Sequence, residues 1–417
     1  MVTYRLRGGQ QLKTTVSLPS SKSISNRALV INALNDGRAE LQHVSDCDDT
    51  QVMVRALHDM PALIDIKAAG TSMRFLTAYL SATPHGTHTI TGTERMRHRP
   101  ISMLVDALRY LGASITYTGT EGFPPLAISG STLKGGHMEI PGNVSSQYIS
   151  ALLLIGPVLS GGLELRLLGR ITSKPYIDLT LWMMREFGAD TEWTSVDTIK
   201  VAPKAYSRTA PYYIESDWSA ASYWYAMVAL SADAEAEVRL EGLTDGSKQG
   251  DSAVKYLFSL LGVQTTFASR MAGVPTTVTL RKSQHRVTHL DYDFTGHPDL
   301  AQTFVVCCAM MGVHFHFKGL HTLKIKETDR IEAMKREMRK LGFVVTDIDG
   351  RELRWDGERC NPEAAAIDTY EDHRMAMAFA PVCMKQPIAI NNPQVVSKSY
   401  TRFWDDLKAG GVTLSEE

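Results

Sequence analysis

The sequence predicts an α/β protein in which a repeated unit is shared between two domains. At 417 residues the chain is too long for one ordinary hydrophobic core, which favours two domains. With 44% hydrophobic and 21% charged residues it has the composition of a globular protein with ample material to bury. An internal repeat, in which an amphipathic helix, a glycine and an alternating strand follow one another, indicates the α/β class.

The repeat is seen when predicted helix ends are compared. Leu108–Tyr117 resembles Met183–Trp193, and the same shape returns in Leu257–Phe267 and Met338–Thr346. The glycines that follow these helices are spaced roughly equally, at Gly112, Gly188, Gly262 and Gly342, and a fainter copy ends the chain at Leu407–Val412. This period exceeds that of solenoid repeats, so each unit has room for two helices and several strands.

The first copy of the repeat looks truncated. Its helix, which follows Val52, runs into Met60-Pro61 without the usual Leu-Gly and strand. We expect a domain boundary near Tyr213 to Ser216, after a polar segment that contains prolines.

Charge and cysteine usage exclude several classes of protein. The 44 basic and 45 acidic residues give a net charge of −1, so no global field draws the chain to nucleic acid or to a membrane. The five cysteines lack metal-site spacing, which favours a reducing cytoplasm. The N-terminal residues do not resemble a signal or transit peptide, and glycines and prolines interrupt the most apolar region, Ile149–Leu168. We therefore expect a cytoplasmic protein without a transmembrane span.

The stretch from Ser20 to Ala28 is the first candidate site. It follows an alternating segment that ends at Pro19 and precedes an apolar helical run, so Lys22 and Arg27 lie at or just inside a helix start. Free backbone N–H groups and the positive end of the dipole favour an anion there. A serine cap with two solvated cations explains the stretch equally well.

Further clusters of polar residues precede predicted helices in the first half of the chain. They are Ala69–Arg74, the arginine-rich Glu94–Pro100, Gly142–Gln147 and Ser173–Asp178. Small-residue turns into a helix let backbone N–H groups approach an anion, although such turns also serve simply as caps. Three arginines within five residues usually need an anion or an acidic partner, but a solvated loop is an alternative.

The second half of the chain shows the same pattern in His297–Leu300, Lys326–Arg330, Asp372–Met377 and Val396–Tyr400. Lys326 and Arg330 are four residues apart, so we expect them to share a helix face. Caps and ordinary helix salt bridges are the alternatives, but cations at a helix start oppose the dipole and make a bound anion more plausible. If these helix starts converge, they form a cation-rich cleft with few carboxylates, in which Asp299 and Glu327 are available for proton transfer.

Taken in order, these segments resemble the 5-enolpyruvylshikimate-3-phosphate synthase family of enolpyruvyl transferases. The resemblance covers residues 16 to 404 and rests on SLPSSKSISNRA, AGTSMR, ERMRHRP, GNVSSQYISALL, SKPYID, ESDWSAAS, HPDLAQT, KETDR, DHRMAM and VVSKSY. It implies two similar domains of the inverse α/β barrel type, each of three βαβαββ units. The domains would be residues 20–214, on the shikimate 3-phosphate side, and residues 1–19 with 215–417, with the active site in the cleft between them.

The resemblance also implies the reaction, the pathway and the site. The family transfers the enolpyruvyl group of phosphoenolpyruvate to the 5-hydroxyl of shikimate 3-phosphate, with release of phosphate and no metal or organic cofactor. The reaction belongs to the shikimate pathway to chorismate and aromatic amino acids, and glyphosate competes with phosphoenolpyruvate. We expect a monomer whose partners are these small substrates.

By matching motif, the residues implied in catalysis are Lys22, Asp299 and Glu327. Those implied in binding shikimate 3-phosphate are Lys22, Ser23, Arg27, Ser145, Ser146, Gln147, Ser173, Tyr176, Asp299, Thr322 and Lys326. Those implied in binding phosphoenolpyruvate are Lys22, Gly70, Arg99, Gln147, Arg330, His373, Arg374 and Lys398. Asp299 would accept the 5-hydroxyl proton, and Glu327 with Lys22 would handle the proton at the methylene carbon.

Three positions depart from the family pattern. Ala68 and Thr322 replace asparagines that are common in relatives, and Phe75 stands where proline is usual. Because Phe75 lies at the start of the helix that borders the phosphoenolpyruvate pocket, we expect weakened inhibition by glyphosate.

Two alternatives remain. The sister enolpyruvyl transferase acting on UDP-N-acetylglucosamine typically has Lys-Asn in the first motif and a loop cysteine. Here Ser23 follows Lys22, and residues 87–100 contain no cysteine. A non-catalytic nucleic-acid-binding protein that uses the arginine cluster is disfavoured by the near-zero net charge.

Overall fold

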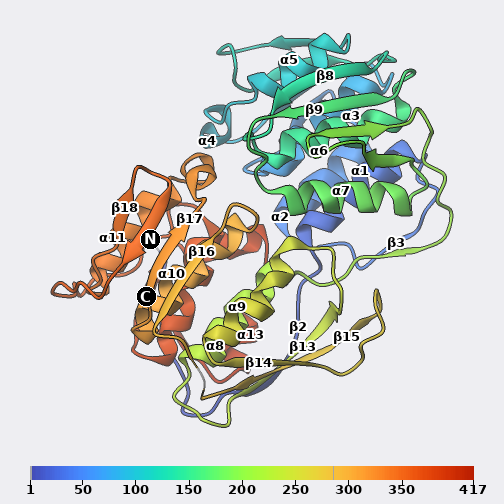
Figure 1. Cartoon of the computed structure of the whole chain (residues 1–417). Coiled ribbons are helices and arrows are strands. Elements are labelled where there is room, and N and C mark those ends of the chain that lie inside the picture. The colour runs from blue at the N-terminus through green and yellow to red at the C-terminus, as the bar shows by residue number, and fades with distance from the viewer. Residues whose placement is uncertain (1, 285) are drawn as a thin grey trace. The chain divides into compact units, whose positions relative to one another are not determined.

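The computed structural model describes residues 2–284 and 286–417, and the chain divides into two compact units (Figure 1). The contiguous unit is Ser20–Ile214. The split unit combines the N-terminal residues up to Pro19 with Glu215–Glu417. Each unit is described by itself.

The contiguous unit contains two complete βαβαββ motifs. The first consists of β4 (Leu63–Asp65), α3 (Gly70–Ala82), β5 (Thr87–Thr91), α5 (Ser102–Tyr110), β6 (Ser114–Tyr117) and β7 (Leu126–Ser129), with the short α4 (Glu94–Arg97) before α5. The second consists of β8 (Gly136–Pro141), α6 (Ser146–Ile155), η1 (Gly156–Val158), β9 (Leu163–Leu168), α7 (Lys174–Glu186), β10 (Thr191–Trp193) and β11 (Thr198–Val201). Their strand orders are β4-β5-β7-β6 and β8-β9-β11-β10, and in each sheet only the first two strands are parallel.

The third motif of this unit is truncated, as the sequence predicts. It consists of α1 (Lys22–Leu34), β3 (Leu41–Gln42) and α2 (Asp48–Asp59), and after α2 the chain enters β4 without an antiparallel hairpin. Its first strand comes from the far end of the unit, where β12 (Tyr212–Tyr213) pairs in parallel with β3. The motif is therefore β12-α1-β3-α2 when it is followed around the unit, and it lacks its last two strands.

The split unit contains three βαβαββ motifs, two of which use strands from the N-terminus. The first consists of β2 (Lys13–Ser17), α8 (Trp218–Leu230), β13 (Glu237–Thr244), η2 (Gly250–Ala253), α9 (Val254–Leu260), β14 (Val263–Phe267) and β15 (Pro275–Lys282). The second consists of β16 (His289–Asp293), η3 (Pro298–Leu300), α10 (Ala301–Met311), β17 (His314–Lys318), η4 (His321–Ile325), α11 (Arg330–Lys340), β18 (Thr346–Ile348) and β19 (Glu352–Trp355).

The third motif of the split unit includes a strand from the N-terminal segment. It consists of α12 (His373–Phe379), η5 (Ala380–Met384), β20 (Ile388–Asn391), η6 (Pro393–Lys398), α13 (Phe403–Ala409), β21 (Thr413–Glu416) and β1 (Thr3–Arg7). Its first strand is reduced to a parallel bridge between Ile367 and Ile390. Strand β1 lies between β20 and β21 and is antiparallel to both, so residues near the two ends of the chain share one sheet.

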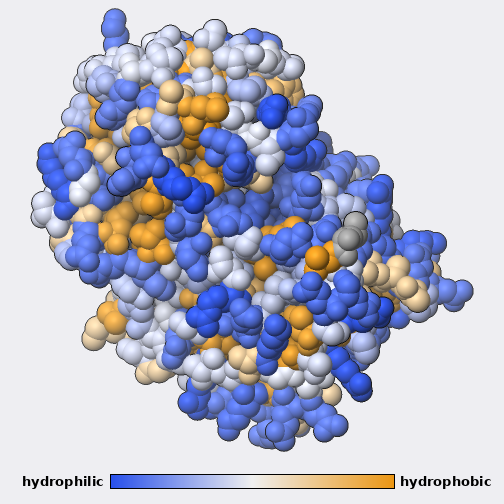
Figure 2. Space-filling model, turned by 180° about the vertical axis from the view of Figure 1, so that it is seen from behind, coloured by the Kyte–Doolittle hydropathy of each residue, from blue (hydrophilic) through white to orange (hydrophobic). Residues whose placement is uncertain are grey.

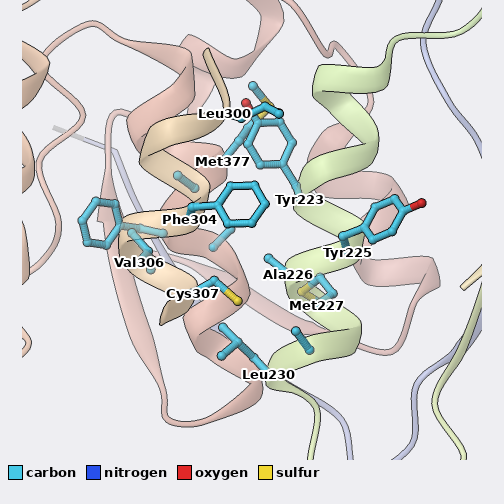
Figure 3. Close-up of a cluster of buried hydrophobic side chains, with 14 of the residues drawn as sticks. Tyr223, Tyr225, Ala226, Met227, Leu230, Leu300, Phe304, Val306, Cys307 and Met377 are labelled. Carbon is cyan, nitrogen blue, oxygen red and sulfur yellow. The ribbon is translucent and has the colours of Figure 1, made fainter. Parts of the chain in front are cut away.

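In both units the first helix of each motif lies in the core. In the contiguous unit α3 packs against α6, and α1 contacts both, while in the split unit α10 packs against α8 and α12. Helix α8 is buried around its whole circumference, which explains why its sequence is apolar on every side. Figure 3 shows side chains of α8 and α10, including Met227 and Phe304, filling the space between these two helices.

The predicted glycines follow the second helix of each motif. Gly112, Gly188, Gly262, Gly342 and Gly411 all have φ between +80° and +101°. This conformation ends a helix and is unfavourable for residues with a Cβ. The internal repeat inferred from the sequence is therefore a repeat of structure.

No helix within the described residues is both long and apolar enough to cross a membrane. On the face of the molecule shown in Figure 2, hydrophilic residues cover most of the surface, and apolar side chains gather in patches between them.

Candidate functional site

The residues expected to carry the chemistry gather at helix starts in each unit. In the contiguous unit these are the starts of α1, α3, α6 and α7, and in the split unit those of α10, α11 and α12. The first helices of the motifs pack together in each core, which places their N-terminal ends near one another. Backbone N–H groups without helical partners and the positive dipole end make such a region favourable for anions.

Arg27 of α1 is a buried cation without a counterion. Its Nε donates to Thr180 Oγ1 at 2.7 Å, and its Nη1 donates to the Ser23 carbonyl at 2.9 Å. Nη2 donates to Ser150 Oγ at 3.2 Å and to the Tyr176 carbonyl at 3.4 Å. All four acceptors are neutral, and no carboxylate of the described residues forms an ion pair with it. Burial therefore lowers the pKa of Arg27 to about 10.

Lys22 is the first residue of α1, and its charge is also withdrawn from solvent. Its Nζ lies 3.1 Å from Asp49 Oδ2 of α2, and the two side chains are 14% and 6% exposed. Ser21 caps the helix by accepting a hydrogen bond from the Ile24 N–H at 3.4 Å. The serine-cap interpretation is thus right for Ser21, but Lys22 and Arg27 are not solvated cations.

The start of α3 brings two guanidinium groups against Gly70. A Cβ at Gly70 would lie 2.7 Å from Arg99 Nη1 and 3.1 Å from Arg74 Nη1, so a larger residue there would displace these guanidinium groups. Arg99 is 8% exposed, and its Nε has no hydrogen-bond partner within the described part of the chain. Gln147 at the start of α6 donates to Thr71 Oγ1 at 3.0 Å and joins the second motif to this region. Two adjacent guanidiniums at an uncapped helix start are an arrangement that favours an anion.

In the arginine-rich segment before α5, only one of the three arginines is buried. Arg95 and Arg97 are exposed, and Arg97 Nη1 lies 3.9 Å from Glu94 Oε2. Arg99 alone of the three is buried. Glu94 is thus an acidic partner for Arg97, and the short helix α4 leaves Arg95 and Arg97 exposed, as the solvated-loop alternative expects.

Hydroxyl groups surround Arg27 and Gln147. Ser145 caps α6 by accepting from the Gln147 N–H at 3.3 Å, and Ser146 is half-buried. Ser173 is buried before α7 with φ +53°, a conformation that is uncommon outside glycine. Such strained residues cluster at functional sites.

The split unit holds a second cluster, which is centred on Arg330 at the start of α11. The Arg330 side chain is 1% exposed and contacts three carboxylates. Its Nη1 lies 3.1 Å from Asp299 Oδ1, its Nη2 lies 2.9 Å from Glu327 Oε2, and its Nε lies 2.6 Å from Asp372 Oδ2. One guanidinium therefore fixes both residues that the sequence suggests for proton transfer.

Three more cations complete this cluster. Arg374 Nη2 lies 3.0 Å from Asp299 Oδ2, and Lys326 Nζ lies 3.7 Å from Asp299 Oδ1. Lys398 Nζ lies 3.3 Å from Glu327 Oε1. Together with Asp372, the cluster has three carboxylates against four cations, so the expectation of very few carboxylates is wrong for this unit.

The cations control the protonation of Asp299. Burial alone would raise the pKa of this carboxyl, but Arg374, Lys326 and Arg330 outweigh it and hold the pKa far below its usual range. Burial also lowers the pKa of Lys326, an effect that Asp299 opposes. In this arrangement Asp299 is ionised and only weakly basic.

One alternative interpretation and two local predictions about this cluster are wrong. Asp299 does not cap α10, because it lies in η3 and its carboxylate faces arginines. Lys326 and Arg330 do not share a helix face, because Asp329 caps α11 and Lys326 precedes the helix in extended backbone. Lys398 ends η6, where its charge agrees with the helix dipole, instead of opening a helix.

Two other expected binding residues, Thr322 and His373, also belong to the split unit. The Thr322 hydroxyl lies in η4 and has no hydrogen-bond partner among the residues the structure describes. His373 is 1% exposed, and its Nδ1 lies 3.7 Å from Asp372 Oδ1.

The structure adds residues that no sequence signal indicated. Asp49 pairs with Lys22 from a separate helix, Thr180 and Ser150 bind Arg27, and Tyr223 accepts from Arg374 Nη1 at 3.3 Å. These are contacts between distant segments, which local pattern does not encode. Among residues 2–284 and 286–417 there is no group of three His, Cys, Asp or Glu side chains placed to hold a metal ion.

The fold is that of the enolpyruvyl transferases. EPSP synthase from Acinetobacter baumannii matches with a TM-score of 0.77 at 23% identity, over 100% of both chains. The enolpyruvyl transferase NikO from Streptomyces tendae matches with a TM-score of 0.71 at 15% identity, over 100% of this chain and 99% of its own.

The sequence places the chain within one family of that fold. The family model described as EPSP synthase (3-phosphoshikimate 1-carboxyvinyltransferase) matches residues 6–65 and 59–407. A 3-phosphoshikimate 1-carboxyvinyltransferase of Bacteroides fragilis is 57% identical over 99% of this chain and 100% of its own length. One from Photobacterium profundum is 33% identical over 98% of both chains. The chain belongs to the EPSP synthase family, which confirms the resemblance seen in its motifs.

Proposed function

We propose that the protein transfers the enolpyruvyl group of phosphoenolpyruvate to the 5-hydroxyl of shikimate 3-phosphate and releases phosphate, in the shikimate pathway. Membership of the family supports this reaction. At the level of residues the proposal rests on the Arg330 cluster, in which Asp299 and Glu327 lie 3.1 and 2.9 Å from one guanidinium. In a reaction that removes one proton and adds another, two carboxyl groups in fixed positions can serve as general base and general acid.

We assign each substrate to the residues that match the family's motifs. Shikimate 3-phosphate is assigned Lys22, Ser23, Arg27, Ser145, Ser146, Gln147, Ser173, Tyr176, Asp299, Thr322 and Lys326. Phosphoenolpyruvate is assigned Lys22, Gly70, Arg99, Gln147, Arg330, His373, Arg374 and Lys398. The uncompensated charge of Arg27 supports a phosphate ligand, and the paired guanidiniums at Gly70 support a second anion.

In the proposed reaction Asp299 removes the proton of the 5-hydroxyl, and the oxygen bonds to C2 of phosphoenolpyruvate while C3 gains a proton. Glu327 and Lys22 transfer the proton to and from C3. The resulting tetrahedral phospho-ketal loses phosphate as its C2–O bond breaks, and C3 gives up a proton to restore the double bond. Fixed cations stabilise the oxygens on which charge grows.

Substrate binding would also activate the base. In the free protein Arg374, Lys326 and Arg330 suppress the basicity of Asp299. When substrate carboxylate and phosphate groups share the charge of these cations, the pKa of Asp299 rises toward its usual value. The base then becomes effective only when phosphoenolpyruvate is in place.

The test of the proposed function is phosphate release from purified protein supplied with both substrates. We expect release that requires shikimate 3-phosphate and does not occur with UDP-N-acetylglucosamine as the acceptor. Folded protein that releases no phosphate with shikimate 3-phosphate would overturn the assignment, and release with the nucleotide sugar would transfer it to the sister enzyme.

We further propose that the enzyme works in the cytoplasm as a monomer. All five cysteines are free thiols, and four of them are buried, which supports a reducing compartment. Analytical ultracentrifugation at assay concentrations should give a single species of about 46 kDa. A stable dimer under those conditions would contradict this proposal.

A further inference from the structure

The backbone immediately before α12 adopts an unfavourable conformation. Tyr370 and Glu371 have φ of +53° and +57°, and the Asp372 N–H donates to the Thr369 carbonyl at 2.8 Å. Positive φ at both central residues with this hydrogen bond is the arrangement of a type I′ turn, which favours Asn-Gly. Tyrosine and glutamate have no such preference, so other contacts must stabilise the Thr369–Asp372 turn.

Helix α11 supplies those contacts from a buried carboxylate. Glu337 is fully buried, and its Oε1 accepts from the Tyr370 hydroxyl at 2.6 Å. Its Oε2 accepts from the Asp368 N–H at 3.0 Å and lies 2.8 Å from Lys340 Nζ. Lys340 Nζ also lies 2.9 Å from Asp368 Oδ2. The residues before and within the turn are therefore fixed to one face of α11.

The Thr369–Asp372 turn also positions Asp372, which contacts two of the proposed substrate-binding arginines. Asp372 is fully buried, and its carboxylate accepts from Arg330 Nε at 2.6 Å and from Arg330 Nη2 at 3.2 Å. Its Oδ1 also accepts from the Arg374 N–H at 2.8 Å and so caps α12. Arg330 precedes Glu337 by seven residues, two turns of the same helix, so α11 contacts both ends of the Asp368–Asp372 segment.

We infer that the Tyr370–Glu337 hydrogen bond is a positioning device for the phosphoenolpyruvate site. It stabilises the Thr369–Asp372 turn, and through Asp372 it sets the orientation of the Arg330 guanidinium. Tyr370 and Glu337 are positioning residues, since neither belongs to the group that meets substrate. The assignment of the ligand to phosphoenolpyruvate rests on the proposed function, whereas the control of the turn by Glu337 does not.

The variant Tyr370→Phe removes the hydroxyl and keeps the ring. Loss of a hydrogen bond to a buried carboxylate should raise KM for phosphoenolpyruvate about 10-fold, with KM for shikimate 3-phosphate changed less than about 2-fold. The double variant Tyr370→Phe with Glu371→Gly should recover most of this loss, because glycine accepts positive φ without strain. Glu371 is exposed, so its replacement removes no buried contact.

Tyr206→Phe provides the matched control. The Tyr206 hydroxyl is buried in the contiguous unit and donates to the Leu154 carbonyl at 2.9 Å. Its loss should lower Tm without a selective effect on KM for phosphoenolpyruvate. Equal changes in both KM values for Tyr370→Phe, or no rescue by Glu371→Gly, would overturn the positioning role.

Native-state hydrogen exchange tests the turn independently of activity. The N–H groups of Asp372 and Arg374, which donate within and beside the turn, should exchange faster in Tyr370→Phe and recover in the double variant. Unchanged exchange would refute the inference even if the proposed reaction is correct. Inactive wild-type protein with the expected exchange pattern would refute only the proposed reaction.

Discussion

Replacement of Arg27 by methionine should separate binding from stability. Arg27 is buried among neutral acceptors, and three of these keep another partner when it is removed. Ser150 Oγ and Thr180 Oγ1 lie 2.8 Å apart, and Thr180 Oγ1 donates to the Tyr176 carbonyl at 2.8 Å. Methionine fills much of the same volume without a charge.

The magnitude follows from the pKa of the guanidinium. The shift from 12.5 to about 10 means that the folded state holds this charge at a cost of about 3 kcal/mol. Because the folded pKa is below the unfolded one, the cost is present at neutral pH and disappears only as pH rises from 10 to 12.5. Arg27→Met should therefore change the free energy of unfolding by between zero and about 3 kcal/mol in the stabilising direction.

The same replacement should weaken the binding of shikimate 3-phosphate, although it stabilises the fold. Loss of a buried cation that contacts phosphate typically costs about 2–5 kcal/mol, so KM for shikimate 3-phosphate should rise about 30-fold or more. Thermal unfolding should be measured without phosphate or sulfate, since either anion would stabilise the wild type alone. Steady-state kinetics with saturating phosphoenolpyruvate give the KM.

Arg208→Met is the control, because Arg208 is also bonded to carbonyl groups in the contiguous unit. Its Nη1 lies 3.6 Å from Glu186 Oε2, and its guanidinium lies 5.6 Å from the Phe187 ring and 5.2 Å from the Tyr212 ring. Loss of these contacts should lower Tm and leave KM unchanged. If Arg27→Met lowers Tm as Arg208→Met does and keeps a normal KM, Arg27 is a structural arginine and the reasoning fails.

Three further predictions concern the chemistry, the inhibitor and the effect of pH. Glu327→Gln keeps a group that can hydrogen-bond Arg330, so substrate binding should persist while kcat falls about 10²- to 10⁴-fold, and unchanged kcat would remove Glu327 from the reaction. The inhibition constant for glyphosate should exceed that of relatives with proline in place of Phe75, and an equal constant would contradict this. Burial and a neighbouring carboxylate raise the pKa of Asp251 from 3.8 to about 6, so the wild type should lose stability as pH rises between these values. Asp251→Asn should abolish this dependence. Above pH 6 its free energy of unfolding, measured in urea, should exceed that of the wild type by up to about 3 kcal/mol, and parallel pH profiles of the two proteins would refute the assignment.

Local signals predicted the architecture well. The glycines that end the repeated helices could be found because positive φ imposes a residue choice that is visible in sequence. The helix starts at Lys22, Gly70 and Ser146 could be found because small or hydroxyl residues precede an apolar run. The family confirms the βαβαββ organisation, and the truncated motif was visible as a missing Leu-Gly after α2.

Contacts between distant segments were beyond such signals. Nothing near Asp49 indicates that it pairs with Lys22, and nothing near Tyr212 indicates that β12 supplies a strand to the truncated motif. The expected shared face of Lys326 and Arg330 failed because Asp329 caps the helix and sets its start at Arg330, after Lys326. Lys326 still lies close to Asp299, so the two residues do belong to one cluster, although Lys326 is not part of the helix that was expected to place it there.

The use of β1 and β2 by separate sheets of the split unit has a consequence for synthesis on the ribosome. Strand β2 pairs with β13, whereas β1 pairs with β20 and β21, which are among the last segments to be made. Residues 20–214 can find all their strand partners within one continuous segment. The nascent chain should therefore fold that segment first and carry β1 as an unpaired strand until translation is nearly finished. During that interval the backbone N–H and carbonyl groups of β1 are available to a chaperone.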